Sequence, residues 1–143
     1  MADIYEFQLA LDLPSDLPEA DLAVLRWHLG QEGGVRGDYE YPLWEDRGPA
    51  RRIGGVLVGE LASDDWGWAL TVRQEVHPDE FDDLDRLVAW LGARTTTPGS
   101  IGHLRFYEDH VPDVLVARSG SVHAVILREE ERTERGARVL PAP

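Results

Sequence analysis

The chain contains no cysteine, no lysine and no asparagine. Without cysteine it can form no disulfide framework, thiolate nucleophile or cysteine-type zinc site. Without lysine and asparagine it cannot supply a Schiff-base lysine, a P-loop lysine or an asparagine oxyanion donor. These absences remove several classes of enzyme from consideration.

Long apolar runs are absent as well. No stretch approaches the roughly 20 residues that a helix needs to span a bilayer. The first residues, MADIYEF, lack the basic start and the apolar segment of a secretory signal. We therefore expect a cytoplasmic protein with no membrane partner.

Positive charge is scarce. All 14 basic residues are arginines, and 27 acidic residues bring the formal net charge to −13. Such a charge opposes binding to phosphate backbones, which requires a basic surface. We therefore expect no nucleic-acid partner.

The length and composition suit one folded domain. With 143 residues and a hydrophobic fraction of 43%, the chain can bury one proper core but not two. We assign residues 1–127 to a single α+β domain and residues 128–143 to a charged, flexible tail.

Hydrophobic periodicity indicates the secondary structure. Strict alternation is typical of a half-buried strand, and apolar residues at helical spacing indicate a helix. The predicted elements are strands at residues 4–13, 53–61, 66–76 and 101–108, helices at 16–30 and 79–92, and a hairpin at 114–127 that turns at Ser119-Gly120. Trp66 is expected on the apolar face of its strand, and Asp16 is expected to cap the first helix.

The order of these elements is β-α-β-β-α-β followed by a hairpin. Two split βαβ halves of this kind resemble the ferredoxin-like plait, in which both helices cover one face of an antiparallel sheet. The resemblance is one of topology alone, and it implies a polar sheet face opposite the helices.

The segment HPDEFDD, residues 77–83, places one histidine and four carboxylates in seven positions. A metal site could be drawn there, but the spacing matches no recognised ligand pattern. Acids in a first helical turn interact favourably with the helix dipole. We therefore interpret the segment as a helix start, with Asp79 as its cap and an Asp82–Arg86 pair, and we predict no metal site.

Aromatic residues in an irregular region form the first candidate surface. Residues 31–52 are predicted to be a long loop, whose aromatics either plug the core or contact a partner. The first helix also carries apolar residues on two sides, which calls for cover by this loop or by a second chain. We therefore predict a homodimer and list as candidate partner-binding residues Trp27, Trp90, Tyr39, Tyr41 and Trp44.

The polar face of the predicted sheet forms the second candidate surface. In the plait, residues of the first, third and fourth strands meet there, and arginines on rigid strands can clamp a carboxylate or phosphate. The equal alternative is a solvated face of paired charges. The candidate ligand-binding residues are Arg73, Arg105, His103 and Tyr107.

No convincing catalytic set or cofactor motif emerges, so we expect a non-catalytic protein without a cofactor. The favoured hypothesis is a small acidic protein that binds a protein partner, as an inhibitor or immunity protein does. The alternative is a small-molecule-binding protein or enzyme that uses the polar sheet face.

Overall fold

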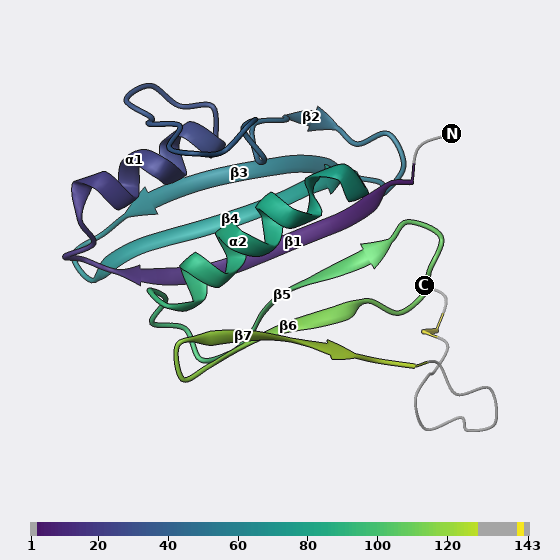
Figure 1. The fold of residues 1–143 in the computed structure, drawn as a ribbon. Coiled ribbons are helices and arrows are strands. Elements are labelled where there is room, and N and C mark those ends of the chain that lie inside the picture. Colours follow the sequence, from purple (N-terminus) through teal and green to yellow (C-terminus); the bar gives the residue numbers. More distant parts are fainter. Residues whose placement is uncertain (1–2, 129–139, 142–143) are drawn as a thin grey trace.

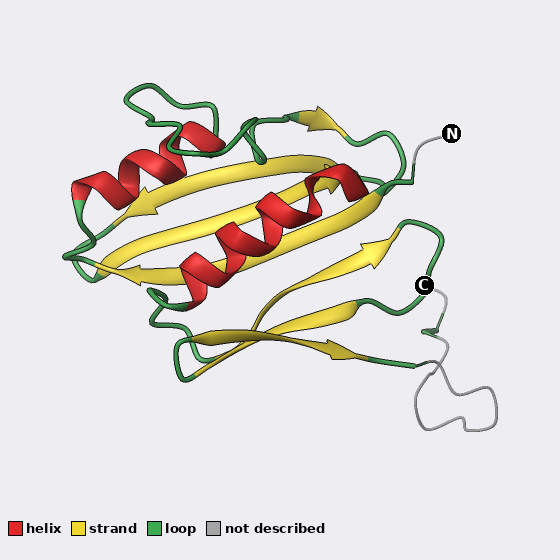
Figure 2. Cartoon of the chain, in the orientation of Figure 1, coloured by secondary structure: helices red, strands yellow, loops and turns green. Residues whose placement is uncertain are grey.

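Seven strands form one antiparallel sheet, and two α-helices lie against one of its faces (Figures 1 and 2). The structure, a computed structural model, describes residues 3–128 and 140–141. The elements are β1 (Tyr5–Pro14), α1 (Glu19–His28), β2 (Gly48–Pro49), β3 (Val56–Ser63), β4 (Gly67–Val76), the 3-10 turn η1 (Pro78–Glu80), α2 (Phe81–Gly92), β5 (Gly99–Phe106), β6 (Asp113–Arg118) and β7 (Ser121–Ile126). No helix in these ranges is long and apolar enough to cross a membrane.

The strand order is β2-β3-β4-β1-β5-β6-β7. The α+β class, the antiparallel sheet and the two helices confirm the prediction at that level. The specific ferredoxin-like plait is not confirmed, because the sheet has seven strands and a longer order. The short β2 extends one edge, and the β6–β7 hairpin extends the other. Most of the predicted tail lies outside the described residues, as do residues 1–2.

The central strand β1 follows the predicted alternation. Its odd-numbered residues face the helices, and Phe7, Leu9 and Leu11 are buried in the core. Its even-numbered residues face the opposite side, which we call the open face. Period-two alternation therefore decides which residues of the sheet build the core and which build a polar surface.

The predicted helix start at residues 77–83 is confirmed, but its details differ. The chain first forms η1 and then enters α2 at Phe81. The predicted Asp79 cap is wrong: Nδ1 of His77 accepts a hydrogen bond from the Asp79 backbone N–H at 3.1 Å. Arg86 pairs with Asp83 and Asp38, each at 3.0 Å, and not with Asp82 as predicted.

Helix α1 begins later than predicted. Its first residue is Glu19, Pro18 occupies the capping position, and no side chain caps the helix, so the predicted Asp16 cap is wrong. The following loop covers part of the second apolar side of α1: the Val35 N–H donates to the Ala23 carbonyl at 3.0 Å, and Gly34 lies against the backbone of Trp27. Val24 and Trp27 on this side are half-buried. The chain itself thus supplies part of the cover that could have come from a second copy.

The loop between α1 and β2 closes over the core. Trp44 is completely buried with its ring stacked on Phe7, at 5.8 Å between ring centroids. Tyr39 packs edge-on against His28 at 4.4 Å. Gln74 on β4 holds the loop by donating to the Asp46 carbonyl at 2.9 Å and accepting from its N–H at 3.2 Å. These contacts favour the plug over the partner-binding alternative.

The loop also creates a buried histidine. The Leu43 N–H donates to Nδ1 of His28 at 3.2 Å, and burial lowers the pKa of His28 from 6.5 to about 4. Asp83 raises this pKa and Arg86 lowers it, both to a smaller extent. His28 is therefore neutral in the folded protein near neutral pH.

This burial predicts a pH-dependent stability. In the interval between 6.5 and about 4 the unfolded chain binds a proton at His28 and the folded chain does not. The free energy of unfolding should therefore fall by roughly 3 kcal/mol from this group as the pH decreases across that interval. Urea unfolding at several pH values gives the free energy of unfolding as a function of pH. This free energy should change less steeply with pH in His28→Gln than in the unaltered protein, and equally steeply in the exposed His123→Gln. Equal slopes in both variants would contradict the role of His28.

The predicted hairpin turn at Ser119-Gly120 is confirmed. Both residues have positive φ, 49° and 81°, as a two-residue turn of this type requires. The hairpin continues the sheet beyond β5, and α2 reaches it where Gly92 packs against Val122. Figure 1 shows that α2 crosses above the central strands and leaves much of β6 and β7 uncovered.

Candidate functional site on the open face

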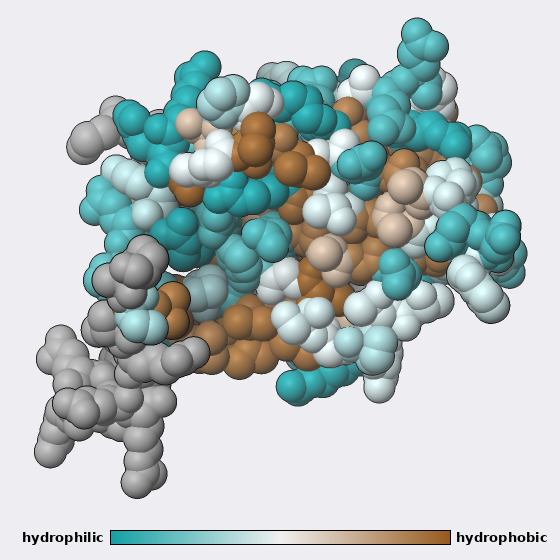
Figure 3. All heavy atoms as spheres, turned by 180° about the vertical axis from the view of Figure 1, so that it is seen from behind, coloured by the Kyte–Doolittle hydropathy of each residue, from teal (hydrophilic) through white to brown (hydrophobic). Residues whose placement is uncertain are grey.

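The open face brings together polar side chains from three neighbouring strands. Glu6 on β1 lies opposite Glu75 on β4 and Arg105 on β5, while Gln8 lies opposite Arg73 and His103. Seen from behind, this side of the molecule mixes hydrophilic and hydrophobic residues (Figure 3). The predicted meeting of these strands' polar residues on one surface is therefore observed.

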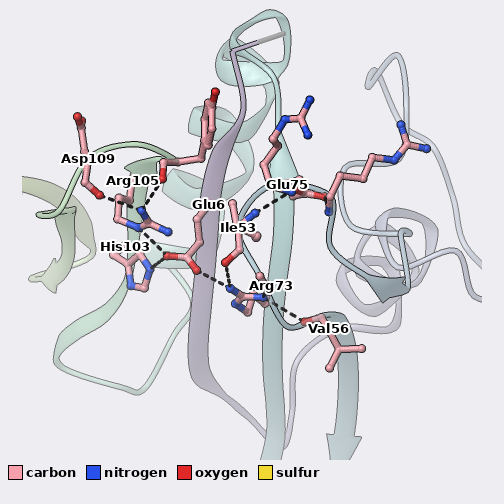
Figure 4. A network of polar contacts seen from close by, with 12 residues as sticks. Glu6, Ile53, Val56, Arg73, Glu75, His103, Arg105 and Asp109 are labelled. Atoms are coloured by element: carbon pink, nitrogen blue, oxygen red, sulfur yellow. Dashed lines mark hydrogen bonds and ion pairs between the residues drawn. The ribbon is translucent and has the colours of Figure 1, made fainter.

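Glu6 is the centre of the cluster. Its Oε2 accepts from Nη2 of Arg73 at 2.7 Å, and its Oε1 lies 2.7 Å from Nε2 of His103. Oε1 also accepts from Nε of Arg105 at 3.2 Å (Figure 4). Only 8% of Glu6 is exposed. Three of the four predicted ligand-binding residues thus share one buried carboxylate, which we call the Glu6 cluster: Glu6, Arg73, His103 and Arg105.

The environment of Glu6 favours its charged form. Burial raises the pKa of its carboxyl group, whereas hydrogen bonds from His103, Arg73 and Arg105 lower it. The net result is a pKa below the ordinary 4.5. The stability that this carboxylate contributes is present above pH 4.5 and is lost as the pH falls through the lower folded-state pKa.

Both arginines of the cluster are engaged further with the backbone. Arg73 donates to the carbonyls of Gly54 at 2.6 Å and of Ile53 at 3.1 Å. Arg105 donates to the carbonyls of Tyr107 at 3.0 Å and of Asp109 at 2.9 Å. Each guanidinium therefore fixes a neighbouring loop, and little of its donor capacity is left for a ligand.

Glu75 also fixes a neighbouring loop, through a carboxylate instead of a guanidinium. Its carboxylate accepts from the backbone N–H groups of Arg51 at 2.8 Å and Arg52 at 2.6 Å, and from that of Ile53 at 3.3 Å (Figure 4). The segment that precedes β3 is thus held from both sides, by Glu75 through its N–H groups and by Arg73 through its carbonyls.

A shallow depression of about 280 Å³ adjoins the cluster. Its lining includes Gln8 and Ala10 from β1, Ser100 and His103 from β5, and Val114 from β6. Among the described residues, no partner is found for the Gln8 amide, the Ser100 hydroxyl or Nδ1 of His103. These groups could hydrogen-bond a small polar ligand, with Glu6 orienting the imidazole.

Tyr107, the fourth predicted ligand-binding residue, follows the end of β5. Its N–H donates to the Ile4 carbonyl at 3.0 Å, and its ring packs edge-on against Phe106 at 5.0 Å. A hydrogen bond to Glu108 raises the pKa of its phenol. Tyr107 therefore touches the Glu6 cluster through its backbone carbonyl, which accepts from Arg105.

The predicted partner-binding aromatics fall into three groups. Trp44 and Tyr39 are buried and present no ring to a partner in this structure. Trp27 and Trp90 are half-buried, and Trp90 is covered by the guanidinium of Arg94 at 4.1 Å. Tyr41 remains 65% exposed. Of the five, only Tyr41 is largely exposed to solvent.

Sequence reasoning missed the most exposed aromatic residue among those described. Trp66 was predicted on the apolar face of a strand, but β4 begins at Gly67 and Trp66 sits in the preceding turn, 89% exposed. The adjacent turn formers Asp64 and Asp65 could have indicated this, because an aspartate carboxylate at such a position binds the N–H groups of the next residues.

Comparisons with known proteins yield no relative: no family model, curated protein or solved structure matches the chain. In residues 3–128 and 140–141, no three histidine, cysteine, aspartate or glutamate side chains are grouped so as to hold a metal ion. The function must therefore be argued from the chain's own geometry.

Proposed function

We propose that this protein is a non-catalytic binding protein that recognises a basic protein partner, as inhibitors and immunity proteins do. One observation carries the proposal: acids outnumber arginines by 27 to 14, and most arginines on the folded domain are engaged within the chain. Arg51, Arg52 and Arg118 are the exposed arginines in residues 3–118 whose side chains make no ion pair or hydrogen bond with the described residues. Among the described residues, the ion pairs of arginine are Arg26–Glu19, Arg73–Glu6, Arg86–Asp38, Arg86–Asp83, Arg94–Asp21 and Arg105–Glu6.

Another arginine is committed to the backbone. Arg47 donates to the carbonyls of Trp44 and Asp46 at 2.8 Å and of Leu29 at 3.1 Å, which anchors the loop over the core. The excess of acids, which gives the net charge of −13, is therefore left largely uncompensated on the surface. A surface of this kind attracts a basic partner and accelerates its encounter.

This proposal predicts a salt-sensitive complex. The immobilised protein is used to capture partners from an extract, and each captured protein is purified and tested again in isolation by calorimetry. We expect a basic partner whose dissociation constant rises about tenfold or more between about 0.05 M and about 0.5 M salt, because salt screens exposed charges. A purified partner that is acidic, or whose affinity is independent of salt, would contradict the proposal.

A second candidate function is small-molecule binding or catalysis at the depression beside His103. The unpartnered groups of Gln8, Ser100 and His103 favour it, and the saturated Arg73 and Arg105 argue against an anion clamp. Ligands that raise the unfolding temperature should lose this effect in His103→Gln.

The homodimer, the cytoplasmic location and a plait formed by β3, β4, β1 and β5 with both helices stay predictions.

A further inference from the structure

The turn between β3 and β4 holds Trp66 in one place. Oδ1 of Asp64 accepts from the backbone N–H groups of Trp66 at 2.8 Å and of Gly67 at 3.1 Å, and the Asp64 N–H donates to the Gly67 carbonyl at 3.0 Å. Gly67 lies so close to β1 that an added Cβ would be 2.4 Å from the Leu13 carbonyl oxygen. The turn is thus closed internally and pressed against the end of β1.

The Trp66 ring itself has no structural task in this turn. The residue is 89% exposed, while the turn is made by backbone groups and by the Asp64 carboxylate. A tryptophan buries about 150–250 Å² when it is covered, so its exposure forgoes a large hydrophobic gain. Tryptophan is also among the residues most enriched at the energetic centres of protein interfaces. A rigidly presented, uncovered Trp66 fits that role.

A hollow of about 410 Å³ lies beside this ring, at the end of the sheet where β1 and β4 meet. Its lining residues include Trp66, Trp68, Asp12, Asp64 and Thr96. Asp12 lies opposite Ala69 on the open face, whereas Trp68 lies opposite Leu13, so the Trp68 ring is on the helix side of the sheet. No arginine in the described part of the chain lines it. Arg26 lies over the Trp68 ring at 6.0 Å but is paired with Glu19. The Trp66 indole and the Asp12 carboxylate attract the same kind of group, a cation with an apolar stem.

We propose that this hollow, which we call the Trp66 hollow, receives an arginine or lysine side chain of the basic protein partner. The ring of Trp66 covers the aliphatic stem and faces the cationic head, and the Asp12 carboxylate, which has no partner among the described residues, pairs with the charge. The inference rests on the proposed function and adds to it the location of the contact.

A titration with short peptides tests the hollow directly. The probe is acetyl-Arg-Ala-Arg-amide, the control peptide is acetyl-Glu-Ala-Glu-amide, and the readout is the indole N–H signal of each tryptophan in a nitrogen-15 NMR spectrum. We expect the Arg peptide to shift the Trp66 signal and to leave Trp27 and Trp44 unmoved. The Glu peptide should shift none of them.

Variants separate the hollow from the general acidity of the surface. Trp66→Ala should weaken binding of the Arg peptide about fivefold or more, and Asp12→Asn about twofold or more. Tyr41→Ala, which removes another exposed ring outside the hollow, should leave binding unchanged. All three variants should unfold at nearly the same temperature as the unaltered protein, because these side chains are exposed and make no hydrogen bond or ion pair with the described residues.

Two results would overturn the inference. One is an Arg peptide that shifts signals all over the acidic surface and binds Trp66→Ala as well as the unaltered protein. The other is a captured basic partner whose salt-sensitive affinity is the same for Trp66→Ala. In that second case the proposed function stands and only the hollow is excluded, whereas loss of salt dependence would exclude the proposed function itself.

Discussion

Replacing Glu6 with glutamine should lower the free energy of unfolding by about 3 kcal/mol. The change leaves Arg73, His103 and Arg105 without the carboxylate that they share, and it turns an amide donor towards one of them. Breaking a buried ion pair costs about 3–5 kcal/mol, and the lower end applies because the three side chains that bind Glu6 are still 20–25% exposed. Urea unfolding at neutral pH measures the difference.

A matched control lies on the same face. Glu60 on β3 is exposed and makes no ion pair among the described residues, so Glu60→Gln should change the unfolding free energy by no more than about 0.5 kcal/mol. The difference between Glu6→Gln and the unaltered protein should also shrink below pH 4.5, as the native carboxylate becomes protonated. Equal effects of the two substitutions would show that the Glu6 cluster is only a solvated set of surface charges.

Removing the ring of Trp44 should have an effect as large or larger. Trp44→Ala empties a completely buried site between Phe7 and the loop, and substitutions of this type cost about 3–5 kcal/mol. The backbone N–H of Trp44 donates to the His28 carbonyl at 2.9 Å, so the cavity opens where the loop is attached to α1. We expect a lower unfolding temperature and faster proteolysis of the loop.

Tyr41→Ala is the control, because it removes an aromatic side chain from the same loop at an exposed position. It should leave the unfolding temperature nearly unchanged. Equal unfolding temperatures of Trp44→Ala and Tyr41→Ala would show that the loop is not a plug. They would favour the alternative, in which Trp44 contacts a partner.

The sequence by itself determined the features that depend on neighbouring residues. Alternation in β1 identified the core and open faces, because successive strand residues point to opposite sides. The apolar stripe of α2, the helix start at residues 77–83 and the Ser119-Gly120 turn are local in the same sense. The candidate set Arg73, His103 and Arg105 followed from face and strand order, and the structure brings these residues together.

Only the tertiary structure decided what those residues contact. Sequence places Arg73 on the open face, but it cannot show that distant carbonyls of Ile53 and Gly54 consume its donors. It gives Trp44 and Trp66 the same aromatic character, yet one is buried and the other exposed, because the loop folds inward and the β3–β4 turn points outward. The burial of a side chain and the use of its hydrogen-bond donors depend on segments far apart in the chain. The periodicity and spacing of residues in the sequence therefore cannot predict them.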